Sequence, residues 1–75
     1  MKTLKIALSS INDIRDFVCI TFKYDFEMDI TSDRYVVDAK SLMGIISLDL
    51  SKPVELKIHS DDCEEFLKEI ERFTV

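Results

Sequence analysis

Two serines stand immediately before segments that are predicted to be helices. Ser10 precedes the apolar pattern that begins at Ile11, and Ser41 precedes a short apolar run. A serine at such a position accepts a hydrogen bond from a backbone N–H of the first turn, which stabilises the helix by about 1 kcal/mol. The free N–H groups at a helix start also favour a negative charge there.

The other side chains that could react are carboxylates, one histidine and two cysteines. Asp13 stands three residues after Ser10, where its charge favours a helix start, and a carboxylate can also act as a covalent nucleophile. His59 has no second metal ligand near it in the sequence, so no metal site is predicted. Cys19 and Cys63 match no metal or redox spacing and are predicted to be buried free thiols.

The composition favours one small folded domain over residues 1–75. Apolar residues make up 47% of the chain, which separates it from disordered sequences. The net charge of −5 argues against nucleic acid as a partner, because phosphate backbones are bound by clustered Lys and Arg. No apolar run is long enough to cross a membrane and no signal-peptide core is visible, so we expect no membrane partner and a cytoplasmic setting.

The first half of the chain predicts a strand, a helix and a hairpin. Residues 3–8 alternate apolar and polar side chains, which predicts a strand. Residues 24–30 alternate in the same way, residues 31–33 are typical of a turn, and residues 34–39 form the return strand. Between the first two strands, apolar side chains recur at helical spacing: Ile11, Ile14, Phe17, Val18 and Thr21.

The second half predicts two more helices with a strand between them. A short apolar helix opens at Ser41 and reaches about Leu48. Residues 54–58 alternate and predict the fourth strand. Ser60 or Asp61 is expected to cap the last helix. The apolar stripe of that helix consists of Cys63, Phe66, Leu67, Ile70 and Phe73.

This order of elements, βαββαβα, predicts an α+β fold. Each helix has one apolar face and the sheet needs cover on one side. We therefore expect a two-layer, open-faced sandwich with a four-stranded, mainly antiparallel sheet and its helices on one face. Ferredoxin-like and ACT-like domains share much of this periodicity, and the additional helix at Ser41 argues against them. An exposed strand at residues 24–30 would also allow a homodimer.

Two short runs carry a resemblance to a known family. Residues 23–25 read Lys-Tyr-Asp, and residues 40–44 read Lys-Ser-Leu-Met-Gly. They are similar to the opening of the second strand and to the Lys-Ser-Ile-Met-Gly run of the HPr family, the phosphocarriers of the phosphoenolpyruvate-dependent sugar phosphotransferase system. The order of elements agrees with HPr as well. The resemblance implies the HPr-like open-faced sandwich and no cofactor.

The resemblance also identifies the family's reactive loop. HPr proteins have a Gly-Ile-His-Ala-Arg-Pro core there and carry phosphate on the His ring. The corresponding residues 8–16 form a shorter segment without histidine. A gap in the loop puts Ser10 at the His position and Asn12 at the Arg position. A gap in the helix puts Asp13 at the His position and Arg15 at the Arg position. We favour the first placement, because loops tolerate deletion better than packed helices.

The resemblance therefore implies a regulatory or docking role. Phosphohistidine has a labile P–N bond, whereas phosphoserine is too stable to pass its phosphate on. In Gram-positive relatives, a dedicated HPr kinase acts on the serine that matches Ser41. The expected partners are proteins of a phosphotransferase or catabolite-control system. They would dock on small and apolar residues of the Ser41 helix, namely Leu42, Met43, Gly44 and Ile46.

Two other functions are compatible with these residues. A divergent phosphocarrier would use Asp13 or His59 as its acceptor. A small-molecule-binding module of the ACT type would share the two-layer fold, although the sequence has no glycine-rich ligand loop. The fold by itself does not decide between them.

Overall fold

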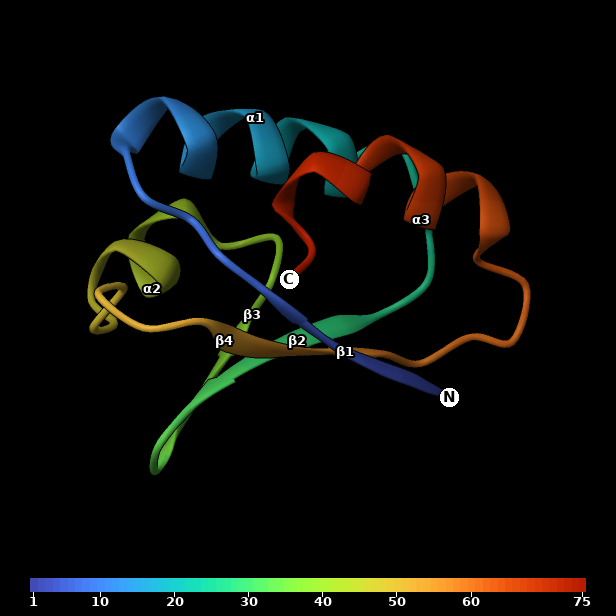
Figure 1. Ribbon diagram of the computed structural model, residues 1–75. Helices are drawn as coiled ribbons and strands as arrows, with labels where there is room; N and C mark the ends of the chain where they lie inside the picture. Colours follow the sequence, from blue (N-terminus) through green and yellow to red (C-terminus); the bar gives the residue numbers. More distant parts are fainter.

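The structure, a computed structural model, describes residues 1–75 and has the helices and strands in the predicted order. The strands are β1 (Lys2–Ile6), β2 (Met28–Ser32), β3 (Tyr35–Asp38) and β4 (Val54–Ile58), and the helices are α1 (Ile11–Thr21), α2 (Leu42–Ile46) and α3 (Glu64–Glu69), with a 3-10 turn at Glu71–Phe73. The sheet order is β1-β4-β2-β3, and all neighbours are antiparallel. Figure 1 shows α1 and α3 on one face, which confirms the open-faced α+β prediction. No helix has the length and apolarity of a membrane span.

The core lies between the sheet and the helices. In β4, Val54, Leu56 and Ile58 point toward the helices and are at most 2% exposed, as the alternation predicts. The strand register aligns Leu56 with Leu4 of β1 and with Ile30 of β2. Burying such a side chain contributes about 1.5–3 kcal/mol. The helical layer adds Ile14, Phe17, Val18, Phe66, Ile70 and Phe73.

β1 is shorter than its sequence pattern. The predicted strand reached Leu8, but pairing with β4 ends at Ile6, opposite Val54. The next N–H, from Ala7, donates instead to the carbonyl of Phe73 at 2.8 Å. The C-terminal segment therefore pairs with the outer side of β1, where Thr74 lies opposite Ile6 and the N–H of Val75 donates to the Lys5 carbonyl at 3.1 Å, while Leu8 stays buried in the core.

The strand predicted at residues 24–30 begins only at Met28. Its pairing with β4 ends at Met28, opposite Ile58, and is followed only by one hydrogen bond from the N–H of His59 to the carbonyl of Glu27 at 2.9 Å. Tyr24 and Phe26 pack against Phe66 instead, with ring centroids 5.2 and 5.8 Å from the Phe66 ring. Aromatic packing against α3 therefore overrides the local alternation.

The position of β2 also changes which edges of the sheet are free. β2 lies between β4 and β3, so both of its sides are paired. The expectation of an exposed edge at residues 24–30, and of a dimer through it, is therefore wrong. The outer strands are β1 and β3, and the C-terminal segment pairs with the end of β1 at Ile6.

The β2–β3 hairpin turns slightly later than predicted. Ser32 pairs with Tyr35, which leaves Asp33 and Arg34 as the loop. Asp33 has a φ of 54°, in the left-handed region that Asp tolerates better than most residues. This tight turn starts the short strand that leads to α2.

The last helix is capped differently from the prediction. Its N-cap is Cys63, whose side chain makes no capping hydrogen bond. The Ser60 hydroxyl accepts from the N–H of Asp62 at 3.1 Å. The Asp61 carboxylate binds the amino group of Met1 at 2.7 Å. The predicted caps are therefore wrong, because both side chains are used in the loop before the helix.

The two cysteines are free, as predicted, but only one is buried. Cys63 is 4% exposed and belongs to the core. Cys19 lies on the exposed side of α1, since Phe17 and Val18 take the buried positions of that turn. The prediction of burial is wrong for Cys19.

Candidate functional site

Three side chains hold the start of α1. The Ser10 hydroxyl accepts a 3.2 Å hydrogen bond from the N–H of Asp13, which confirms Ser10 as the predicted cap. The Asp13 carboxylate accepts from the N–H of Ser9 at 3.3 Å and from its hydroxyl at 2.9 Å. Both candidates for the family's His position are thus engaged in capping this helix.

The residues selected by the two alignments of the reactive loop all lie at the N-terminal end of α1. Ser10 and Asp13 are joined by the capping hydrogen bond. Asn12 and Arg15 lie in the first turns beside them, and both are exposed. The fold therefore gathers all four predicted residues at the positive end of one helix.

Ser41 caps α2 as predicted. Its backbone is extended, and its hydroxyl accepts from the N–H of Gly44 at 3.1 Å. A Cβ on Gly44 would lie 3.1 Å from the Ser41 hydroxyl oxygen and 3.2 Å from the Cβ of Val37 in β3. A side chain at this position would therefore push Ser41 or Val37 away by a few tenths of an ångström.

α2 presents apolar side chains to solvent. Met43 is 74% exposed and Ile46 is 39% exposed, while Leu42 is half-buried. Ile45 is fully buried and fixes the helix to the core. The N-terminal end of α1 lies next to α2 (Figure 1), so the predicted docking residues and the start of α1 share one side of the molecule.

A network that the sequence did not indicate ties α3 to the segment after α1. Lys40 Nζ donates to the Tyr24 carbonyl at 2.7 Å. The Tyr24 hydroxyl donates to Glu69, whose other carboxylate oxygen accepts from Lys23 at 2.8 Å. The bond to Glu69, together with burial and the nearby negative charge, raises the pKa of Tyr24 to about 12. The bonds from Lys23 and Tyr24 lower the pKa of Glu69.

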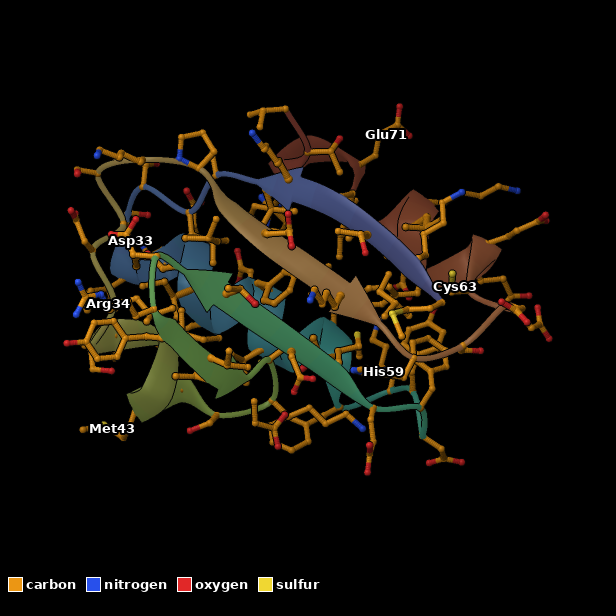
Figure 2. All side chains as sticks on the ribbon, turned by 90° about the horizontal axis from the view of Figure 1, so that it is seen from below. Asp33, Arg34, Met43, His59, Cys63 and Glu71 are labelled. Atoms are coloured by element: carbon orange, nitrogen blue, oxygen red, sulfur yellow. The ribbon has the colours of Figure 1, made fainter.

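The only histidine, His59, lies on the uncovered face of the sheet. Its Nε2 is 2.8 Å from the carboxylate of Asp29 in β2. Figure 2 views this face and shows His59 at the end of β4, with Met43 on the opposite side of the molecule. No three His, Cys, Asp or Glu side chains are placed to hold a metal ion. His59 is therefore remote from the other candidate residues.

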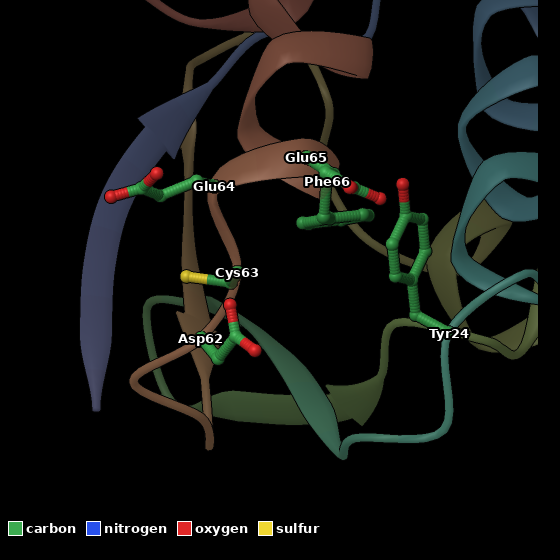
Figure 3. A pocket seen from close by; sticks show the side chains of 6 residues that line it. All are labelled: Tyr24, Asp62, Cys63, Glu64, Glu65 and Phe66. Carbon is green, nitrogen blue, oxygen red and sulfur yellow. The ribbon is translucent and has the colours of Figure 1, made fainter.

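A pocket of about 330 Å³ lies at the start of α3 (Figure 3). None of the predicted site residues lines it. Its acidic side chains would repel a phosphate or another anion. The lining residues are Tyr24, Asp62, Cys63, Glu64, Glu65 and Phe66.

Comparison with known proteins points to one family. Residues 15–74 match the family model described as PTS HPr component phosphorylation site. The chain is similar to the crystal structure of HPr-C-His from Thermoanaerobacter tengcongensis, with 30% identity and a TM-score of 0.79 over 96% of this chain and 89% of that one. It also shares its fold with phosphocarrier protein HPr from Bacillus anthracis str. Ames, with 24% identity and a TM-score of 0.73 over 99% and 94% of the two chains. No curated protein matches the chain.

Proposed function

Because the chain belongs to the HPr family of the sugar phosphotransferase system, we propose that it works by docking to proteins of that system and not by carrying phosphate on histidine. The observation that carries the proposal is the location of His59. This residue is the only histidine, and it pairs with Asp29 on the uncovered face of the sheet. The start of α1, where the resemblance expects the acceptor, holds Ser10 and Asp13.

Neither residue at the start of α1 replaces an imidazole. A phosphate on Ser10 would be too stable to pass to the next protein. The Asp13 carboxylate accepts two hydrogen bonds from Ser9, and an acyl phosphate there would give them up. These contacts favour a capping role for both residues over divergent phosphate carriage.

The proposed docking surface is the exposed side of α2, formed by Leu42, Met43, Gly44 and Ile46. Met43 and Ile46 are 74% and 39% exposed, although α2 is anchored in the core by Ile45. Adjacent exposed apolar side chains on a rigid element are typical of a protein-binding surface. The flexible Met43 side chain suits partners of different shape. The proposed partners are proteins of a phosphotransferase or catabolite-control system.

Phosphorylation of Ser41 by an HPr kinase is the proposed control of this surface. Ser41 precedes Met43 by two residues and caps the helix that carries it. A phosphate there would meet the free N–H groups of the first turn and add charge beside the apolar surface. We propose that the chain acts as a single domain in the cytoplasm, where a kinase with ATP would reach Ser41.

Binding of the chain to an HPr kinase, measured by calorimetry, tests the docking surface. Met43→Asp should weaken binding at least about tenfold, because an apolar interface would then bury a charge. Phe22→Asp is the matched control, since Phe22 is 68% exposed at the other end of α1. An equal loss with both variants, or no loss with Met43→Asp, would contradict the proposed surface.

A further inference from the structure

One edge of the sheet carries exposed apolar side chains. β2 is the only strand beside β3, while α2 packs against β3 at Val37, and on β3 Tyr35 is 69% exposed and Val36 is 64% exposed. The opposite edge, β1, carries exposed Lys2 and Lys5, a charge pattern that discourages pairing with another strand. The β3 edge is therefore the one that is open to a further strand.

The hydrogen bonds next to β3 indicate which backbone groups face outward. The N–H of Ala39 donates to the carbonyl of Met28, at the start of β2, at 2.9 Å. Along an antiparallel strand, the backbone groups of successive residues point alternately toward and away from the neighbour. The backbone N–H of Val37 therefore points toward β2, like that of Ala39. The N–H groups of Val36 and Asp38 point away from β2, toward the free side of β3.

We propose that a second copy of this chain pairs with this edge, with the two β3 strands antiparallel and Val36 on the two-fold axis. Each Val36 then exchanges two backbone hydrogen bonds with the partner's Val36. The N–H of Asp38 reaches the carbonyl of the partner's Arg34. The Asp38 carbonyl takes no part, because it already accepts from the N–H of Ser41 at 2.9 Å. The pairing is isologous and closes as a dimer.

Charge complementarity selects a second copy as the occupant. Arg34 stands two residues before Val36, and Asp38 stands two residues after it. The two-fold axis at Val36 therefore puts Arg34 of each copy opposite the partner's Asp38. Opposite charges directly across two strands are stabilising and like charges are destabilising. Shifting the register by two residues removes both pairs, so the charges also specify the register.

Sedimentation equilibrium over a range of protein concentrations tests this pairing. The wild-type chain of 8.7 kDa should approach twice its mass in the millimolar range. Arg34→Asp and Asp38→Arg each set like charges opposite one another and should weaken association about tenfold. An equimolar mixture of the two variants restores both pairs and should associate like the wild type. Lys2→Asp makes the same charge change as Arg34→Asp on the opposite edge and should have no effect.

Asp38 also accepts a 2.9 Å hydrogen bond from the N–H of Lys40, so Asp38→Asn serves as a second variant. Its amide oxygen keeps that bond while the charge is lost, and association should weaken although the fold is kept. The proposal is overturned by a wild type that stays monomeric at all concentrations. A mixture that associates no better than its components, or a Lys2→Asp chain as weak as Arg34→Asp, overturns it as well.

The register has its own test by disulfide formation. In a hydrogen-bonded antiparallel pair the two Cα atoms are about 5.5 Å apart, within the range that a disulfide spans. Val36→Cys in a Cys19→Ser background should therefore form a cross-linked dimer rapidly on mild oxidation. Thr3→Cys in the same background places an exposed thiol on β1 and is the control. Equal cross-linking rates for the two variants would rule out Val36 on the axis.

Discussion

The N–H of Gly44 donates a 3.1 Å hydrogen bond to the hydroxyl oxygen of Ser41, so the serine that we propose as a phosphorylation site also caps α2. The same glycine leaves little room for a side chain, because a Cβ would lie 3.2 Å from the Cβ of Val37. Gly44 is thus the point at which α2 contacts both its cap, Ser41, and β3. Substitutions at these two positions separate the structural role of Ser41 from its proposed regulatory role.

Ser41→Ala should lower the free energy of unfolding by about 1 kcal/mol, because the Gly44 N–H loses its acceptor. Ser41→Asp should stay close to the wild type, since a carboxylate at this position still caps the helix and favours its dipole. Urea denaturation of the three proteins measures both effects. Wild-type stability in Ser41→Ala would contradict the capping role.

Gly44→Ala should also destabilise the chain, by about 1 kcal/mol, although alanine is the better helix former. The added methyl group would crowd the Ser41 hydroxyl and Val37. Thermal unfolding measures the change. Met43→Ala on the same helix is the control and should change stability by less than about 0.5 kcal/mol, because that side chain is 74% exposed. A Gly44→Ala protein more stable than the wild type would show that α2 and β3 can separate at little cost.

Tyr24 should titrate with a pKa of about 12, because its hydroxyl donates to Glu69. Tyr35→Phe leaves Tyr24 as the only tyrosine in a chain without tryptophan, so ultraviolet absorbance reports its ionisation. The pKa of Tyr24 lies above the ordinary 10.0, so the protonated hydroxyl stabilises the folded chain. This contribution is complete below pH 10 and is lost as the pH rises toward 12. Adding Glu69→Gln should lower the Tyr24 pKa. An unchanged pKa in the double variant would contradict this contact.

Glu69 gives the opposite pH dependence at the acid end. Lys23 first, and then Tyr24, lower its pKa below the ordinary 4.5. A depressed pKa stabilises the folded chain above pH 4.5, and this contribution is lost as the pH falls through the lowered value. The stability difference between the wild type and Glu69→Gln should therefore be largest near neutral pH and shrink in acid. Glu71→Gln, at an exposed carboxylate in the 3-10 turn, is the control and should show little difference at either pH.

The helix starts that the sequence predicted correctly depend on residues within a single turn. Ser10 and Ser41 each accept from an N–H three residues later, so their spacing alone indicated the caps. The fourth strand was also predictable, since the alternation of residues 54–58 is undisturbed by other contacts. Local chemistry decided these elements, and the βαββαβα order followed from them.

The features that could not be predicted from the sequence depend on contacts between distant parts of the chain. β2 begins at Met28 because β4 ends opposite it, and no local pattern contains that limit. Tyr24 lies outside the strand because Phe66 and Glu69 bind it from α3. The edge strand was mispredicted for a similar reason. The sequence does not show that β2 pairs with both β4 and β3, which leaves β3 and not residues 24–30 at the edge. At the candidate site, spacing predicted which residues gather at the helix starts but not that Ser9 would engage Asp13.

A phosphorylation assay with two arms, read by intact-mass and peptide analysis, tests most directly whether the chain is phosphorylated on Ser41 and carries no phosphate from phosphoenolpyruvate. One arm supplies phosphoenolpyruvate and the first enzyme of the phosphotransferase system, and the other supplies an HPr kinase and ATP. We expect phosphate on Ser41 in the kinase arm, none in Ser41→Ala, and none on any residue in the phosphoenolpyruvate arm. Phosphate transferred from phosphoenolpyruvate to Ser10, Asp13 or His59 would contradict the account and identify the chain as a phosphocarrier.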